Sequence, residues 1–158
     1  MARLILGESI RTLDERYRLS IPPELADPLA EAGSDCILAK ERPGCLSLWN
    51  VATWQGRLDA GIQLVESKIE AGRLEGRVED VQRLGRLLST RHRQVQLAGR
   101  GRRVVPEGFR EFLGVEPGGD AMVVGAAVCV EIWHPEKWAV YVGDQMPAFR
   151  QLLDQLSG

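Results

Sequence analysis

The sequence is poor in the residues that most often carry out catalysis or bind metal ions. Only two histidines, His92 and His134, occur among its 158 residues. His92 lies among arginines, and His134 precedes a proline, where it could cap a helix or lie on the surface. Neither the phosphate loop Gly-x-x-x-x-Gly-Lys-Ser/Thr nor the motif His-Glu-x-x-His is present. We therefore expect no enzymatic activity, no catalytic residue, no metal, no cofactor and no small-molecule substrate.

Cysteine is also scarce. Cys36, Cys45 and Cys129 are an odd number and contain no Cys-x-x-Cys pair. Cys36 and Cys45 could face each other across a hairpin, as a disulfide or as half of a metal site. Because no histidine lies near them in the sequence, buried and reduced thiols are the preferred interpretation.

Long hydrophobic runs are lacking as well. No stretch approaches the roughly 18 apolar residues that cross a membrane. The first seven residues carry one charge and too short an apolar run for a signal peptide. We therefore expect a cytoplasmic protein with no membrane partner.

What the sequence does contain is an internal repeat. Trp49 and Trp54 are spaced like Trp133 and Trp138, and the second pair follows the first by 84 residues. Two further blocks match in the same order at shifts of 84 and 85, namely residues 13–22 with 97–106 and residues 33–38 with 118–123. Such collinear matches indicate a tandem duplication. One unit of roughly 50 residues would have a marginal core, so we expect a single pseudo-symmetric domain over residues 1–158.

Each copy predicts the element order β-β-α-β-β. In the first copy, strands at 9–13 and 18–21 flank a polar turn, and a short helix follows that Pro28 should interrupt. The remaining predicted strands are 36–40 and 45–49 in the first copy, and 93–97, 102–105, 121–125 and 129–133 in the second. We thus predict an α+β fold with copies at 5–54 and 91–142, a helical insert at 55–90 and a C-terminal helix at 143–158.

The insert has apolar residues at helical spacing. Two stripes are present, Leu58, Ile62, Val65 and Ile69, then Val78, Val81, Leu84 and Leu88. Gly72 and Gly76 lie between them, which indicates an αα-hairpin. This hairpin could be plain connecting structure, or its apolar face could pack on the sheet or on a neighbouring subunit. Residues Gln145 to Leu156 predict a final helix.

Charge is unevenly distributed, although the net charge is only −2. Residues 83–110 hold eight arginines against the single acid Glu107, and residues 111–158 hold seven acids against two basic residues. The chain has 17 arginines and three lysines. Arginine is favoured over lysine where a planar group binds phosphate or the edge of a guanine through two hydrogen bonds.

The basic residues that repeat lie at the turns. They are Arg16 and Arg18 in the first copy, and Arg100, Arg102 and Arg103 in the second. Their arginines could be solvated and paired with Asp14 or Glu15. The second turn has no acid of its own, however, and a protruding two-stranded ribbon fits the DNA major groove. Arg91 and Arg93, at the strand entry, are interpreted as phosphate-binding or structural residues.

The stretch Leu13-Asp14-x-x-x-Arg18-Leu19-Ser20-Ile21-Pro22 resembles the Asp-x-x-x-Arg signature of the MraZ family of bacterial regulators of the division and cell-wall gene cluster. The resemblance covers both turns, the helical insert and the Leu-x-Leu-Trp strand ends. It places the signature acid and arginine on Asp14 and Arg18. Tyr17 stands at the turn glycine of the first copy, whereas the second copy keeps Gly101 but has Ala98 at the acid position.

This resemblance implies a double swapped-hairpin β-barrel related to AbrB-type (SpoVT-AbrB) DNA-binding domains. It also implies homo-oligomeric rings that bind double-stranded DNA at repeated promoter elements, in association with the nucleoid. We therefore expect a sequence-specific transcriptional regulator, with repression as the expected direction. Two alternatives stay open: an antitoxin-like protein of the same hairpin class, and a structural or interaction protein that keeps the fold without DNA binding.

Overall fold

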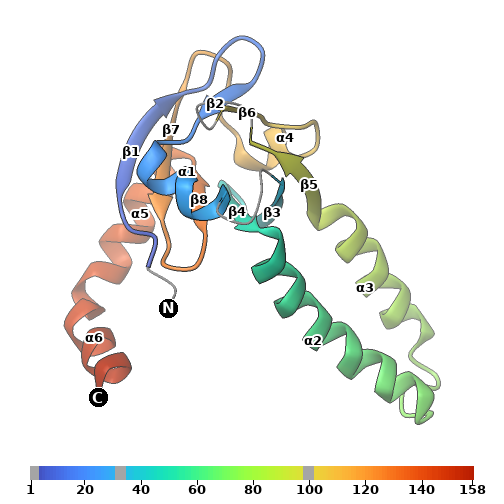
Figure 1. The fold of residues 1–158 in the computed structure, drawn as a ribbon. Coiled ribbons are helices and arrows are strands. Elements are labelled where there is room, and N and C mark those ends of the chain that lie inside the picture. Colours follow the sequence, from blue (N-terminus) through green and yellow to red (C-terminus); the bar gives the residue numbers. More distant parts are fainter. Residues whose placement is uncertain (1–3, 31–34, 98–101) are drawn as a thin grey trace.

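The computed structural model describes residues 4–30, 35–97 and 102–158, and it is a mixed α+β structure (Figure 1). The first copy contributes β1 (Glu8–Thr12), β2 (Arg18–Ser20), α1 (Pro23–Ala30), β3 (Asp35–Arg42) and β4 (Cys45–Asn50). The second contributes β5 (His92–Gln96), β6 (Arg102–Val104), α4 (Phe109–Leu113), β7 (Asp120–Gly125) and β8 (Val130–Trp133). The predicted order β-β-α-β-β is confirmed in both copies.

The strands of the two copies are interleaved. The main sheet has six strands in the order β1-β7-β8-β4-β3-β5, and β2 pairs with β6 in a separate two-stranded sheet. All of these pairings are antiparallel. The first strand of each copy therefore pairs with a strand of the other copy, β1 with β7 and β5 with β3.

Two pairings lie on the pseudo-twofold axis that relates the copies. Ser47 in β4 faces Glu131 in β8, and these residues are 84 positions apart. Leu19 in β2 faces Arg103 in β6, again 84 positions apart. The prediction that the two strands beside each arginine turn form a ribbon within one copy is wrong. Among the described residues, β1 pairs with β7, and β2 pairs with β6. The ladder that carries the arginines is the β2–β6 pair, made by both copies.

One face of the main sheet carries an apolar core drawn from both copies. Leu13, Leu19 and Leu48 of the first copy belong to the same buried cluster as Phe109 and Val123 of the second. Short helices close this core: α1 begins at Pro23 and buries Leu25 and Leu29, and α4 begins at Phe109, three residues after Pro106. Pro28 lies within α1, so the predicted interruption there is wrong. A helix of eight residues has few hydrogen bonds to lose to a proline.

The opposite face of the sheet carries the repeated tryptophans. The Trp49 and Trp54 rings are 5.8 Å apart and the Trp133 and Trp138 rings are 5.3 Å apart, both with an interplanar angle of 57°. The indole N–H of Trp49 donates to Ser47 Oγ at 2.8 Å, and that of Trp133 donates to Glu131 Oε1 at 3.0 Å. The duplication therefore recurs in side-chain geometry.

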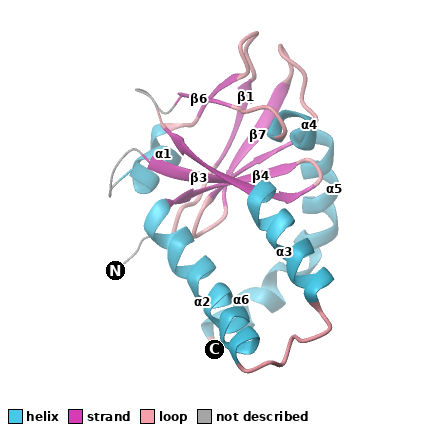
Figure 2. Cartoon of the chain, turned by 90° about the vertical axis from the view of Figure 1, so that its right-hand side faces the viewer, coloured by secondary structure: helices cyan, strands magenta, loops and turns pink. Residues whose placement is uncertain are grey.

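Two helical segments project from the sheet in different directions (Figures 1 and 2). One is the insert hairpin, α2 (Val51–Glu70) and α3 (Val78–Arg91). The other is α5 (Pro135–Gln145), the short 3₁₀ turn η2 (Met146–Ala148) and α6 (Phe149–Ser157). The predicted final helix from Gln145 is corrected, because Gln145 ends α5 and α6 begins only after Pro147. Within the described parts of the chain, none of the residues of α2, α3, α5 or α6 is buried.

The three cysteines are free and buried, as expected. Burial raises the pKa of the Cys36 thiol to about 11 and that of Cys129 to about 12, and it raises the pKa of Cys45 further still. Thiols with such pKa values stay protonated near neutral pH, and the thiolate is the reactive form. These side chains are therefore apolar packing groups of the sheet.

Candidate nucleic-acid interface

The turn between β1 and β2 is organised by Asp14. Its Oδ1 accepts hydrogen bonds from the backbone N–H groups of Arg16 and Arg18, both at 2.8 Å. The backbone closes the same turn, because Tyr17 N–H donates to Asp14 C=O and Asp14 N–H donates to Arg18 C=O, each at 3.0 Å. An aspartate that binds amides two and four residues ahead holds a tight turn in one conformation.

The same carboxylate also binds the Arg18 guanidinium. Arg18 Nε lies 2.7 Å from Asp14 Oδ2, and each side chain keeps 39% of its surface exposed. The Arg18 backbone N–H, together with the guanidinium, holds the pKa of Asp14 below its ordinary value, although partial burial acts in the opposite direction. Asp14 is therefore ionised at neutral pH, and it fixes the direction of the Arg18 side chain.

Arg16 and Arg18 differ in how they are held. Arg16 is exposed at the tip of the turn, and its side chain forms no ion pair with any described residue. Arg18 is half-buried and uses Nε for Asp14, which leaves its Nη donors without a hydrogen bond to another described residue. A guanidinium has five N–H donors in a planar fork, so Arg18 keeps an edge that can still bind an acceptor.

The turn stands at one end of the molecule, beside the loop between α4 and β7 (Figure 1). Gly118 N–H donates to Leu13 C=O at 2.6 Å, and Leu13 N–H donates to Gly119 C=O at 2.9 Å. A loop of the second copy thus supports the turn of the first. The helical segments leave the sheet at its other side (Figure 1).

Of the second turn, the structure describes only β6, the strand that follows it. Arg100 and Gly101 lie outside the described residues. The backbones of Arg102 and Arg103 lie in β6, opposite Ser20 and Leu19 of β2. The structure therefore brings together the two strands that follow the arginine turns.

Arg91 and Arg93 are engaged with their own surroundings. Arg91 Nε donates to the backbone C=O of Lys40 at 2.8 Å, and its Nη2 lies 3.7 Å from Glu41 Oε2. The Arg93 guanidinium lies over the Phe109 ring, 5.6 Å from its centre. These contacts tie β5 to β3 and α4, and the interpretation of both residues as phosphate-binding or structural stays a prediction.

The sequence alone did not single out Arg110 as a residue that contacts the first turn. Its guanidinium lies 3.9 Å from the centre of the Tyr17 ring, and its Nε donates to Val105 C=O at 2.6 Å. The signal was present in the repeat, because the position 84 residues earlier is Ala26 and the arginine has no counterpart. A charged residue that appears in only one copy marks a contact made by only one copy.

The remaining polar cluster lies at the centre of the sheet. Burial, and then the nearby Glu41 carboxylate, raise the pKa of Glu131, whereas the indole N–H of Trp133 and the positive charge of Arg42 lower it. Ser47, which is fully buried, donates to Glu41 Oε1. The part of the chain that the structure describes contains no group of three or more His, Cys, Asp or Glu arranged to hold a metal ion.

Among the described helices, none is long and apolar enough to span a membrane.

Comparison with known proteins gives one consistent result. A family model described as "MraZ protein, putative antitoxin-like" matches residues 89–155. The protein named Transcriptional regulator MraZ from Syntrophomonas wolfei is 28% identical over 153 residues, which cover 97% of this chain and 96% of that protein. Proteins of the same name from Clostridium beijerinckii and Acetivibrio thermocellus are 28% and 25% identical, over 87% and 98% of this chain and 87% and 97% of their own lengths. The alignments thus include both copies and the insert.

Proposed function

The chain belongs to the MraZ family, and we propose that it is a sequence-specific DNA-binding regulator of transcription. The proposed target is the promoter of the division and cell-wall gene cluster, with repression as the direction. The proposed place of action is the nucleoid of the cytoplasm. The name of the relatives, Transcriptional regulator MraZ, supports the general activity.

The observation that carries this proposal is the turn built around Asp14. Its backbone is fixed by four hydrogen bonds among its own residues, and it presents the exposed Arg16 beside the oriented Arg18. Affinity for DNA comes largely from contacts to phosphate, whereas base edges in the major groove are read by side chains such as arginine held in a fixed direction. We assign base reading to Arg18 and phosphate contact to Arg16.

The second turn is proposed to contribute general attraction to phosphate. In the sequence, Arg100, Arg102 and Arg103 have no acid nearer than Glu107. Arginines without a local carboxylate are free to bind phosphate but are not directed toward one base.

The proposed fold is the double swapped-hairpin barrel of AbrB-type domains. The pairing of β1 with β7 and of β5 with β3 supports it, because each copy completes the sheet of the other. The paired strands β2 and β6 support it further, because they bring the exits of both arginine turns to one place.

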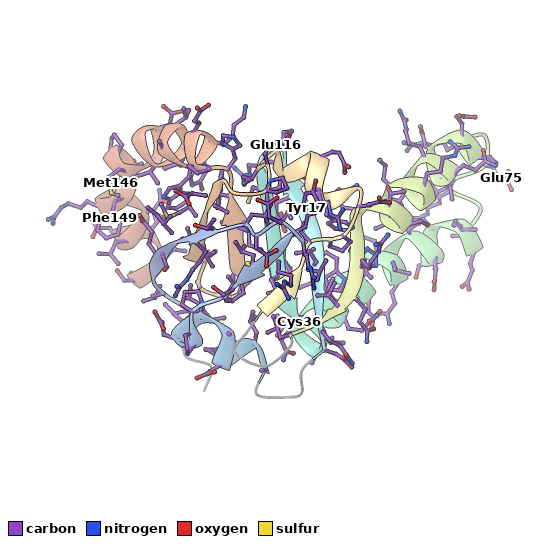
Figure 3. All side chains as sticks on the ribbon, turned by 90° about the horizontal axis from the view of Figure 1, so that it is seen from above. Tyr17, Cys36, Glu75, Glu116, Met146 and Phe149 are labelled. Carbon is purple, nitrogen blue, oxygen red and sulfur yellow. The ribbon has the colours of Figure 1, made fainter. Side chains whose placement is uncertain are left out.

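The proposed assembly is a homo-oligomeric ring that binds repeated promoter elements. Seen from above, Met146 and Phe149 lie at one end of the molecule and Glu75 at the other, with Tyr17 between them (Figure 3). Both ends expose apolar side chains, among them Phe149 at 59% and Leu156 at 79% on one, and Leu64 at 60% and Val78 at 63% on the other. Two different apolar surfaces at opposite ends favour a head-to-tail contact, and such contacts form a ring when the rotation from one subunit to the next closes.

The base of the insert and the C-terminal helices differ in charge. The later half of α3 lies in the arginine-rich segment 83–110, whereas α5 and α6 lie in the acidic segment 111–158. A cavity of about 440 Å³ between α5 and α6, lined by Trp138, Met146, Phe149 and Leu152, would receive apolar side chains of the neighbouring insert.

A gel-shift titration with the DNA upstream of its own gene tests the activity. Arg18→Ala should reduce the discrimination between this DNA and a scrambled duplex by about 1–3 kcal/mol. Arg100→Ala with Arg103→Ala should weaken binding to both duplexes alike and flatten the salt dependence, whose slope is about −0.9 per phosphate neutralised. Arg73→Ala, which removes one charge from the far end of the insert, is the control. If Arg18→Ala and Arg73→Ala give the same result, Arg18 does not read bases.

Light scattering tests the ring. Wild type should be larger than a dimer, and Phe149→Glu with Leu152→Glu should reduce its size, because these changes place charge on the apolar end. A wild-type mass of 17.5 kDa at micromolar concentration would contradict the ring. Affinity should also rise strongly with the number of DNA repeats, because linked weak contacts act together.

The antitoxin-like function is the second candidate, and the description of the matching family as putative antitoxin-like favours it. It predicts that the chain forms a stable complex with a second protein encoded beside it. Co-expression and co-purification of the two products would distinguish this candidate from a regulator that binds DNA alone.

A further inference from the structure

Tyr17 stands in a backbone conformation that suits glycine. Its φ is +59°, in the left-handed region where a side chain with a Cβ is disfavoured. A bulky residue persists there only where its surroundings compensate for the strain. The contacts of Tyr17 should therefore show what holds the arginine turn in place.

Three contacts fix Tyr17 to the second copy. Its backbone C=O accepts a hydrogen bond from Val105 N–H at 2.8 Å. Its ring packs on the shared core and lies under the Arg110 guanidinium, 3.9 Å from the ring centre. Arg110 in turn donates from Nε to Val105 C=O at 2.6 Å. Tyr17, Arg110 and Val105 thus form a closed set of contacts, which we call the Tyr17–Arg110 clamp.

The clamp has no counterpart in the other half of the molecule. The positions that match Tyr17 and Arg110 by the shift of 84 are Gly101 and Ala26. Glycine accepts a positive φ without a compensating contact, and the Ala26 side chain has no charge or ring-stacking group. The sequence therefore replaces both members of the clamp together.

We propose that Arg110 and Tyr17 are positioning residues that set the DNA specificity of the first turn. Tyr17 lies between Arg16 and Arg18, so holding its ring and its carbonyl fixes the backbone from which both arginines project. Val105 directly follows β6, which carries Arg102 and Arg103. The clamp therefore also sets the distance between the first turn and the exit strand of the second. This role rests on the proposed DNA-binding function, but the contacts that support it do not.

Amide hydrogen exchange tests the clamp without DNA. A guanidinium over an aromatic ring contributes roughly 0.5–2 kcal/mol, so Arg110→Ala should speed exchange at Val105 and Tyr17 by about tenfold, and leave the amides of β4 and β8 unchanged. Tyr17→Phe keeps the ring and should behave as wild type. Arg73→Ala removes the same charge elsewhere and is the matched control. Unchanged exchange at Val105 in Arg110→Ala would overturn the proposal.

Tyr17→Gly is a second variant, which tests the clamp by the same measurement if Arg110→Ala fails to fold. It removes the backbone strain together with the ring, so the fold should be kept while Val105 exchange rises about tenfold. The proposal is also overturned if this variant exchanges like wild type at Val105.

Binding to the upstream DNA then tests specificity. Arg110→Ala and Tyr17→Gly should lower the ratio of affinities for the upstream and scrambled duplexes by roughly tenfold. Tyr17→Phe, which keeps the ring, should keep the wild-type ratio of affinities for the two duplexes. If exchange changes as expected but wild type binds no DNA, the clamp stands and the proposed function fails. If wild type discriminates and both variants discriminate equally well, the positioning role is wrong.

Discussion

The two copies have kept the same apolar geometry but have come to use different polar side chains. The tryptophan pairs share an interplanar angle of 57°, and β5 begins 84 residues after β1. At matching polar positions, Ser47 stands against Glu131, and Asn50 against His134. Shape is set by groups that must interdigitate, whereas a hydrogen-bonding role can be filled by several side chains. The copies therefore show which features the fold requires and which belong to one half.

Removing a large buried ring should have the largest effect. Trp49→Ala and Trp133→Ala should each lower the free energy of unfolding by about 3–5 kcal/mol. Both rings contact a second tryptophan and a guanidinium, Trp54 and Arg57 for Trp49, and Trp138 and Arg42 for Trp133. The loss should be greater for Trp133, because its ring also contacts Tyr141. Denaturant unfolding measures both, with half-buried Trp54→Ala as the milder control. Equal losses would mean that the added contacts of Trp133 contribute nothing.

Removing the side chains that cap α2 and α5 should have the next largest effect on stability, and the two losses should differ. Asn50 Oδ1 accepts from the N–H groups of Ala52 and Thr53 at the start of α2, and its Nδ2 donates to Leu29 C=O. His134 caps α5 through one bond, from Glu136 N–H to Nδ1 at 3.1 Å. Asn50→Ala should therefore cost about 1 kcal/mol of stability, and His134→Ala less. Thermal unfolding at one pH above 7 compares them, and the reverse order would contradict this ranking.

Replacing Glu131, at the centre of the sheet, should have a smaller effect on the free energy of unfolding, and this effect should depend on pH. Because the pKa of Glu131 is raised in the folded state, its carboxylate lowers stability at neutral pH, and protonation relieves this as pH falls toward the ordinary pKa of glutamate. Glu131→Gln keeps an acceptor for Trp133 and should be slightly more stable than wild type at pH 7. The two curves of stability against pH should meet on acidification. A variant that is less stable at pH 7 would contradict this expectation.

Asp14 should respond to pH with the opposite sign. Its pKa is lowered in the fold, so its contribution is present above the ordinary pKa of aspartate and is lost as pH falls through the lowered value. Because the carboxylate is partly exposed, the effect should be local and smaller than the others. Amide exchange at Arg16 and Arg18 should speed up in Asp14→Asn at pH 7, and Glu131→Gln is the control that should leave both unchanged.

The sequence predicted the elements well because each depends on local pattern. The strands at β2 and β4, the helical insert and the buried cysteines follow from periodicity and the position of glycine and proline. The strand partners could not be read from such patterns, because the pairing of β1 with β7 joins residues more than a hundred positions apart. Only the resemblance implied an exchange of strands between the copies.

The candidate site was predictable in its residues and not in its contacts. Asp14 and Arg18 stood out by their spacing, and the structure places them 2.7 Å apart. Arg110 did not stand out, because its contact with Tyr17 depends on the packing of α4 against a turn far away in the sequence. The repeat itself was the available signal, at positions where one copy has a charge and the other has alanine.

The pairing of Ser47 with Glu131 has a consequence for symmetry. In a dimer of two identical copies, a residue on the twofold axis must face its own duplicate. A glutamate there would face a second glutamate, and like charges directly opposite each other destabilise a sheet. Joining the copies in one chain removes this requirement, since serine can occupy one position and glutamate the other. Covalent linkage thus permits an acid at the centre of this sheet that an assembly of identical halves would exclude.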